Sequence, residues 1–251
     1  MRRLRWLAVA AGLVVVWQAA VWASGVPHYI LPGPDRVAAA LHARADVIAA
    51  NAWITFVEIL AGFLAGGLIG CAGALAIAYF RPARRWLLPV IVTSQAVPVF
   101  AIAPLLVLWL GYGIGSKIAM SVIIIFFPVT AAFYDGLRRT DPGWIDLAAV
   151  MNATRLRTLA LVRVPAALPA LGSGLRVAAA VAPIGAVIGE WVGSSAGLGY
   201  LMLHANARLQ VDVMFAALFV LALFAVALYF AVDAALRRLI PWQPESLLSE
   251  D

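Results

Sequence analysis

The chain has 251 residues, of which 65% are hydrophobic and 12% are charged, and its formal net charge is +6. A soluble domain of this length needs more polar surface than such a composition provides, so lipid must form part of its solvent. The charged residues lie in short stretches between apolar runs, and this distribution argues against a nucleic-acid-binding protein. Cys71 is the only cysteine, which excludes a disulfide framework.

Apolar runs long enough to cross the hydrocarbon core, which takes about 20 helical residues, recur along the whole chain. The first run starts with several Arg residues but is long for a signal peptide and lacks a small-residue cleavage motif, so it is interpreted as a retained helix. Six spans are therefore predicted, with five or seven as alternatives, at roughly 5–24, 53–80, 86–110, 118–137, 168–191 and 213–236.

This pattern predicts an all-α fold, a polytopic membrane protein of about six transmembrane helices. The whole chain, 1–251, is expected to form a single membrane domain whose core covers about 53–238. A polar loop at 138–165 separates the fourth and fifth spans.

The distribution of Lys and Arg predicts the orientation of these spans. One side has only Arg36, Arg44, Lys117 and Arg208. The other side has Arg2, Arg3, Arg5, Arg81, Arg84, Arg85, Arg138, Arg139, Arg155, Arg157, Arg163, Arg237 and Arg238. Because Lys and Arg gather in cytoplasmic loops, both termini and the 138–165 loop are predicted to lie in the cytoplasm.

Two features near the outer half allow more than one interpretation. A helix is expected at 35–50, either lying on the bilayer surface or contacting an external binding protein. In the second span, Gly62, Gly66 and Gly70 recur every four residues, a spacing that lets two helices approach closely. These glycines are predicted to serve packing within the subunit or, alternatively, a dimer interface.

Two carboxylates lie within predicted spans, where an ionisable group is costly and often functional. Glu58 is near the outer end of the second span, so it could instead reach water or Arg44. Glu190 is near the outer end of the fifth span, before a glycine-rich turn at 193–199. It is expected to act at an outer gate or to hold that turn by hydrogen bonds.

The third span is expected to be broken, because Pro89, Pro98 and Pro104 each remove a backbone hydrogen bond. Membranes tolerate such breaks where the freed groups are buried or line a path, so this span is predicted to be a pathway wall or a bent packing helix. Gln95 is expected to line the central path. The translocation candidates are Ser94, Gln95, Pro98 and Glu190.

The 138–165 loop has the pattern of two short helices. Asp141 can cap a first helix that starts at Pro142, and Thr154 can cap a second. Asn152 interrupts them, since Asn tolerates the left-handed backbone of a tight turn. Apolar residues at helical spacing and several Arg side chains suggest a surface that touches another protein rather than a solvated loop.

Several catalytic and nucleotide-binding motifs are absent from the sequence. It contains no Walker motif, no His-Glu-x-x-His pair, no Gly-x-Ser-x-Gly elbow and no cluster of metal ligands. The prediction is therefore that the chain is not an enzyme and does not itself bind ATP. A membrane-embedded enzyme and a small channel remain the alternative functions.

The polar loop resembles the coupling loop of importer permeases driven by ATP-binding-cassette ATPases. That loop reads Glu-Ala-Ala, three residues, Gly, nine residues, then Ile, any residue and Leu-Pro. Here Asp146 stands at the Glu, Ala148 at the second Ala and Asn152 at the Gly, while Val162, Val164 and Pro165 complete the spacing. The resemblance implies that the ATPase-coupling residues are Asp146, Ala148, Ala149, Asn152, Ala153, Val162 and Pro165.

The resemblance extends over most of the chain and includes 31–34, 95–98, 109–111 and 184–201. It is to a branch that imports sulfonates, taurine, nitrate and vitamin precursors, and 184–200 looks most like the vitamin-precursor group. The family implies a homodimer in the bacterial inner membrane, with two ATPase subunits that use ATP and an extracytoplasmic solute-binding protein. It implies no cofactor in this chain, and the best expectation for the solute is a thiamine pyrimidine precursor.

Overall fold

The computed structural model describes residues 2–94 and 97–242, and these form helices and short connections without any strand. The prediction of an all-α protein is therefore confirmed. In chain order the helices are α1 (Arg2–Ser24), α2 (Pro34–Ala43), α3 (Ala45–Tyr79), α4 (Arg81–Ser94), α5 (Val99–Leu110), α6 (Ile114–Arg138), α7 (Pro142–Val150), α8 (Arg155–Thr158), α9 (Val164–Gly193), α10 (Leu198–Ala207) and α11 (Val211–Leu239).

Four helices are long and apolar enough to cross a membrane: α3, α6, the continuous helix Arg155–Gly193 that includes α8 and α9, and α11. Shorter apolar helices occur at Ala11–Ser24 and Val99–Leu110, within the first and third predicted spans. Each of the six predicted spans thus coincides with a helix or with a pair of helices. The length and apolar composition of the runs were therefore sufficient to predict the positions of these helices.

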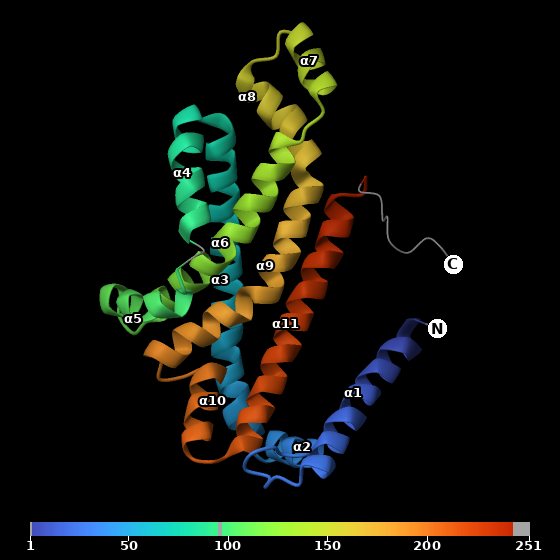
Figure 1. Cartoon of the computed structure of the whole chain (residues 1–251), viewed down its shortest axis with the longest axis vertical. Helices are drawn as coiled ribbons and strands as arrows, with labels where there is room; N and C mark the ends of the chain where they lie inside the picture. Colours follow the sequence, from blue (N-terminus) through green and yellow to red (C-terminus); the bar gives the residue numbers. More distant parts are fainter. Residues whose placement is uncertain (1, 95–96, 243–251) are drawn as a thin grey trace.

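Helix α6 is the centre of the bundle and packs against α3 on one face and α9 on another (Figure 1). The glycines of α3 make the first contact possible. A Cβ on Gly62 would lie 2.4 Å from the Cβ of Ser121, and one on Gly66 would lie 2.8 Å from Ile125. The Gly62–Gly70 motif therefore serves packing within the subunit, as small residues do between membrane helices.

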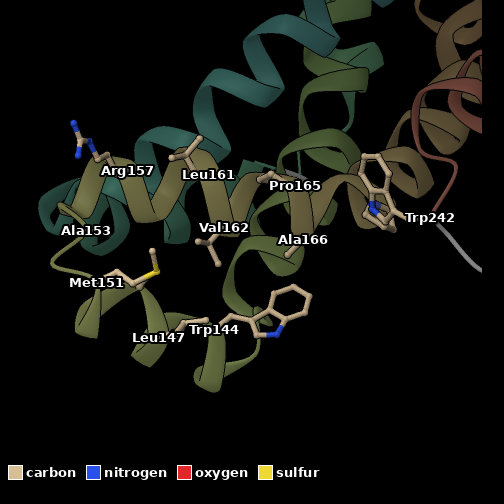
Figure 2. A pocket seen from close by; sticks show the side chains of 12 residues that line it. Trp144, Leu147, Met151, Ala153, Arg157, Leu161, Val162, Pro165, Ala166 and Trp242 are labelled. Carbon is tan, nitrogen blue, oxygen red and sulfur yellow. The ribbon is translucent and has the colours of Figure 1, made fainter.

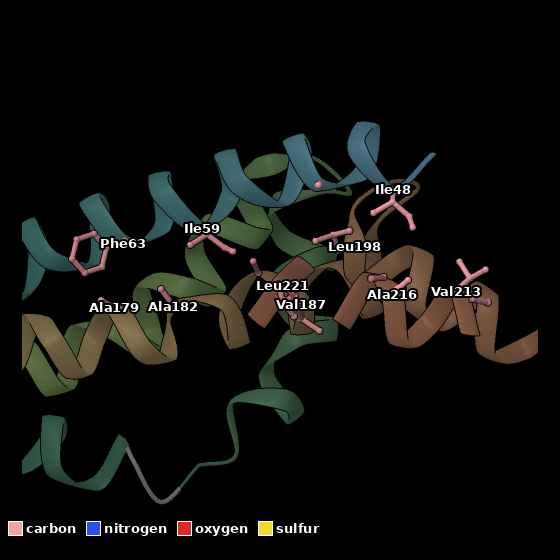
Figure 3. Close-up of a cluster of buried hydrophobic side chains, with 14 of the residues drawn as sticks. Ile48, Ile59, Phe63, Ala179, Ala182, Val187, Leu198, Val213, Ala216 and Leu221 are labelled. Carbon is pink, nitrogen blue, oxygen red and sulfur yellow. The ribbon is translucent and has the colours of Figure 1, made fainter. Parts of the chain in front are cut away.

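The largest hydrophobic core lies where α2, α3, α9, α10 and α11 meet (Figure 3). Large side chains from α3 and α11 face small residues of α9, so the helices interlock closely. The buried residues include Ile48, Ile59, Phe63, Ala179, Ala182, Leu198, Ala216 and Leu221.

The third predicted span is two helices rather than one. Helix α4 ends at Ser94 and α5 begins at Val99, directly after Pro98. The predicted break is confirmed, and it falls at Pro98, whereas Pro89 and Pro104 lie inside α4 and α5. Gln95 lies outside the described residues.

The helix predicted at 35–50 is wrong in its extent. Helix α2 ends at Ala43, and Arg44 is the only residue between α2 and α3, so the second half of that prediction belongs to α3. Helix α2 packs against α11 and buries Val37 and Ala40. Helix α1 lies beside α2, and its Trp17 stacks on Phe215 of α11 with ring centroids 5.9 Å apart.

The short helices lie at opposite ends of the bundle. Helices α7 and α8 are at one end, whereas α2 and α10 are at the other (Figure 1). We call the first the coupling end, after the predicted coupling loop, and the second the outer end, after the orientation that the Lys and Arg distribution predicts.

Candidate coupling surface and buried polar cluster

The 138–165 loop, which we call the coupling segment, contains the short helices α7 and α8. As predicted, the residue directly before α7 caps that helix. The carboxylate of Asp141 accepts a hydrogen bond from the backbone N–H of Gly143 at 2.7 Å, and Pro142 is the first helical residue. A proline is favoured there because its missing N–H would have no partner inside the helix.

The turn between the two helices is a Schellman motif, in which the chain leaves a helix through one left-handed residue. Asn152 is that residue, with φ of 54°. The N–H of Ala153 donates to the carbonyl of Ala148 at 2.9 Å, and the N–H of Asn152 donates to Ala149 at 3.0 Å. The prediction that Asn152 adopts a left-handed turn is confirmed.

The second helix, α8, begins at Arg155 and is capped by Thr154, whose hydroxyl accepts from the N–H of Arg157 at 3.3 Å, as predicted. It continues through a π-helical turn at Leu159–Arg163 into α9 without a break. Pro165 lies near the start of α9 and does not interrupt the helix.

Side chains also tie the coupling segment to the membrane helices. The guanidinium of Arg163 donates through Nε and Nη2 to the carbonyl of Leu137 at 3.1 and 2.8 Å. The hydroxyl of Thr140 donates to the same carbonyl. Arg155 lies over the ring of Tyr79, with Cζ 5.1 Å from the centroid. The segment is therefore held against the ends of both α6 and α3.

Although the coupling segment is a polar loop by sequence, many of its exposed side chains are apolar. Val150 is 79% exposed and Met151 is 73% exposed, and Trp144, Leu147, Leu156 and Leu161 are exposed as well. Next to it, a groove of about 890 Å³ lies between α7, α9 and Trp242 (Figure 2). Exposed apolar patches of this kind mark protein contacts.

The predicted coupling residues divide into two groups. Ala148 is buried and Ala153 half-buried within the turn, so they shape it. Asp146, Ala149, Asn152 and Pro165 are exposed, and Val162 lines the groove with Pro165. The structure thus brings these residues together in one compact segment.

Glu58 does not reach water or Arg44, contrary to one expectation from the sequence. Its carboxylate is 2% exposed, and its Oε1 accepts from Nζ of Lys117 on α6 at 2.7 Å. Its Oε2 has no hydrogen-bond partner among the described residues. Carboxylates inside a membrane bundle are expected to find such a partner, but nothing local in the sequence identifies which one.

Glu190 is also buried, at 1% exposed. Its Oε1 accepts from the Thr55 hydroxyl at 2.6 Å, and its Oε2 accepts from the N–H groups of Gly199 and Tyr200. These partners belong to α3 and α10, whereas Pro98 is exposed at the start of α5. The predicted pathway residues Glu190 and Pro98 therefore lie in different surroundings: Glu190 is buried against α3 and α10, and Pro98 is exposed at the start of α5.

Sequence reasoning missed Lys117, Thr55 and Asn51. Lys117 was placed among the outer loop charges, although α6 begins earlier, at Ile114. Because Lys117 and Glu58 have opposite charges and similar predicted depths in the membrane, the sequence could have suggested that they form a pair. Thr55 and Asn51 gave no signal, because an isolated polar residue near a span end has many ordinary roles.

Comparison with known proteins decides the family. The family described as the binding-protein-dependent transport system inner membrane component matches residues 62–243. The chain belongs to this family. Its members are ATP-binding-cassette permeases, so the chain is a multi-pass membrane transport subunit and not an enzyme.

Curated relatives cover nearly the whole permease. A probable ABC transporter permease protein of Haemophilus influenzae is 54% identical over 95% of this chain and 98% of its own length. The formylaminopyrimidine transport permease protein ThiX of Halalkalibacterium halodurans is 33% identical over 92% of each chain. The riboflavin transport system permease protein RibX of Chloroflexus aurantiacus is 34% identical, over 92% of this chain and 87% of its own.

Solved structures agree on the fold of the permease. An inward-facing conformation of the MetNI methionine ABC transporter aligns with a TM-score of 0.67 and 18% identity. The alignment covers 78% of this chain and 97% of that one. At this identity the likeness establishes the fold alone.

Proposed function

We propose that this permease imports a small heteroaromatic vitamin precursor, with a thiamine pyrimidine precursor as the first candidate. A solute-binding protein delivers the solute at the outer end, and two ATPase subunits drive its passage. The permease works as a homodimer, with both termini and the coupling segment in the cytoplasm.

One observation supports the proposed contact with the ATPase. It is the exposed apolar surface of α7 and α8, which we call the coupling surface. Its two short helices present exposed Val150 and Met151 on a segment that is fixed to α3 and α6 by Arg155 and Arg163. An apolar helix held rigidly in this way suits insertion into a groove of another protein. Asp146, Ala148, Ala149, Asn152, Ala153, Val162 and Pro165 are the residues proposed to shape or make this contact.

Exposed apolar side chains on the membrane helices support the homodimer. Helix α5 exposes Leu105, Leu108 and Trp109, and a small cavity lies between it and Val192 of α9. One copy of the bundle gives only a thin wall for a solute path, so a second copy related by a two-fold axis is needed to enclose it. Ser94, Gln95 and Pro98, at the junction of α4 and α5, are proposed to line that path.

The choice of solute rests on the relatives. Those whose names give vitamin-related solutes, formylaminopyrimidine and riboflavin, are 33% and 34% identical to the permease over most of its length. Both solutes are flat nitrogen heterocycles with several hydrogen-bonding groups, which Gln95 could match by donating and accepting. Sulfonates, taurine and nitrate are the second group of candidates.

Uptake measurements test this proposal. Cells from which the gene is deleted would be complemented with the wild-type gene or with Ala148→Glu, and supplied separately with labelled formylaminopyrimidine, riboflavin and taurine. We expect the deletion to abolish uptake of the pyrimidine, the wild type to restore it and Ala148→Glu to fail. Restored uptake of taurine alone would replace the proposed solute, and loss of none of the three would reject all of these solutes.

A further inference from the structure

Helix α10 at the outer end has no cap of its own. It begins at Leu198 after Gly197, whose φ is 115° and which has no side chain to offer. The first N–H groups of any helix lack partners inside that helix. Here they are satisfied by side chains from two other helices, far away in the sequence.

The cap is assembled from α3 and α9. The N–H of Leu198 donates to the hydroxyl oxygen of Thr55 at 2.7 Å, and the N–H groups of Gly199 and Tyr200 donate to Oε2 of Glu190. The hydroxyl of Thr55 in turn donates to Oε1 of Glu190. Glu190 therefore accepts on both oxygens, on Oε1 from Thr55 and on Oε2 from α10, while the Thr55 hydroxyl also lies 3.3 Å from the carbonyl oxygen of Asn51.

The loop before α10 is fitted closely around this carboxylate. A Cβ on Gly197 would lie 2.2 Å from Cδ of Glu190, so any other residue would displace the cap. The N–H of Gly197 donates to Oδ1 of Asn51 on α3 at 2.7 Å. The loop and the start of α10 are therefore fixed to α3 and α9 together.

A second carboxyl group lies beside this cap. The ammonium of Lys117 is bonded to Glu58, whose carboxyl group lies close enough to Glu190 for the two to interact.

Glu190 and Glu58 differ in the groups that hold them. Both oxygens of Glu190 are occupied as acceptors, by the Thr55 hydroxyl and by N–H groups of α10. Among the described residues, Glu58 accepts only from Lys117, on Oε1. Glu58 is therefore a nearby buried carboxyl group that takes no part in the cap.

We propose that Glu190 is a positioning residue that caps α10 from another helix and thereby fixes the outer surface that the solute-binding protein contacts. This inference rests on the proposed function, since it assumes that such a protein docks at the outer end. The surface concerned is the exposed side of α10, which includes Leu203, His204 and Asn206.

The test compares Glu190→Gln with Glu58→Gln in the complex of the permease and its ATPase, reconstituted in lipid nanodiscs. An amide in place of Glu190 turns one acceptor into a donor that faces either the Thr55 hydroxyl or the α10 N–H groups. We expect the amides of residues 198–200 to exchange hydrogen about tenfold faster. Glu58→Gln changes a nearby carboxyl group that, among the described residues, makes no hydrogen bond with α10, and exchange should stay within about twofold of wild type.

The functional measurement is ATP hydrolysis, with and without the solute-binding protein that supports uptake by the wild-type complex. Glu190→Gln should raise the concentration of binding protein for half-maximal stimulation about tenfold, while hydrolysis without it stays within about twofold. Unchanged amide exchange in Glu190→Gln would overturn the cap. Faster exchange with normal stimulation would overturn the positioning role.

Two further comparisons keep the test decisive. If Glu190→Gln fails to assemble, Thr55→Val removes the acceptor of the Leu198 N–H and the donor to Oε1 of Glu190, but it leaves the bonds from Gly199 and Tyr200 to Oε2. We expect about threefold faster exchange at the amide of Leu198. An unchanged rate there would also overturn the cap. A wild-type complex that no binding protein stimulates would contradict the proposed function, whereas the exchange measurement would still report on the cap.

Discussion

The two ends of the molecule both carry short helices, but these helices are capped in different ways. At the coupling end, Asp141 and Thr154 cap the helices that directly follow them, and Asn152 closes the turn between them. At the outer end, α10 is capped by Thr55 and Glu190, from two other helices. The coupling end is therefore determined by local sequence, whereas the outer end depends on the assembled bundle.

The difference has a physical consequence for how each end responds to change. A locally capped segment keeps its shape as long as its own few residues are intact, so it can present a constant surface to a partner protein. Helix α10 keeps its place only while α3 and α9 keep theirs, since its cap bonds cross between them. The conformation of α10 should therefore depend on the packing of the bundle, whereas at the coupling end only the placement of the segment, through Arg155 and Arg163, depends on α3 and α6.

The largest expected effect tests the coupling end. Proline at position 152 cannot adopt the observed φ of 54°, and it removes the N–H that donates to Ala149. We expect Asn152→Pro to reduce solute uptake and stimulated ATP hydrolysis at least about tenfold, because the coupling surface would be misplaced. Uptake assays and assays of the purified complex would measure this.

The bundle itself should remain intact in that variant. Amide exchange at 198–200 in Asn152→Pro should match wild type, because the α10 cap contacts no part of the coupling segment. Full uptake by Asn152→Pro would contradict the assigned role of the turn, and faster exchange at α10 would contradict the independence of the two ends.

The next prediction concerns the buried ion pair. Removing one partner of a buried pair leaves the other charge without compensation, which typically costs about 3–5 kcal/mol. Lys117→Met should therefore destabilise the permease strongly in detergent unfolding, and Lys117→Met with Glu58→Gln should recover most of the loss. The matched control is Arg138→Ala, because the Arg138–Asp135 pair is exposed and contributes little.

Little recovery in the double variant would contradict the role of Glu58 as the partner of Lys117. Measuring both variants beside Glu58→Gln alone gives the interaction energy of the pair.

The contrast between the ends also explains what could be predicted from the sequence. The apolar runs predicted the spans, and Pro98 predicted the break between α4 and α5. Both predictions were possible because a span and a helix break are determined by residues that are neighbours in the sequence. Caps at Asp141 and Thr154 were predicted for the same reason. The glycine motif of α3 indicated close packing without identifying α6 as the partner.

The polar cluster could be predicted only in part. Glu58 and Glu190 stood out because carboxylates within apolar spans are costly. Their partners, Lys117 and Thr55, lie 59 and 135 residues away in the sequence, and periodicity carries no information over that distance. A hydrogen bond between Glu190 and the glycine-rich turn was one expectation, and in the structure Glu190 accepts it from the N–H of Gly199 at the start of α10.

A third prediction tests the outer end through its glycine. In Gly197→Ala the added Cβ would meet the Glu190 carboxyl group, and the φ of 115° is unfavourable for alanine. We expect a loss of about 2–3 kcal/mol in stability and faster amide exchange at 198–200. Gly115→Ala is the control, because a Cβ there meets nothing within 4 Å and its φ is ordinary. Equal effects of the two substitutions would contradict the close fit of the loop at Gly197 around the Glu190 carboxyl group.

The smallest expected effect returns to the coupling turn. Glycine tolerates the left-handed conformation of position 152 better than asparagine, and asparagine tolerates it better than alanine. Asn152→Gly should therefore retain full coupled ATP hydrolysis, whereas Asn152→Ala should lose about 1 kcal/mol of local stability and only part of the coupling. Amide exchange at Ala153, whose N–H donates to Ala148, reports on the turn directly. The order Gly, Asn, Ala in both exchange protection and coupling would tie the function of the coupling end to its local backbone geometry. A side-chain contact of Asn152 with the ATPase would instead make glycine and alanine equally poor.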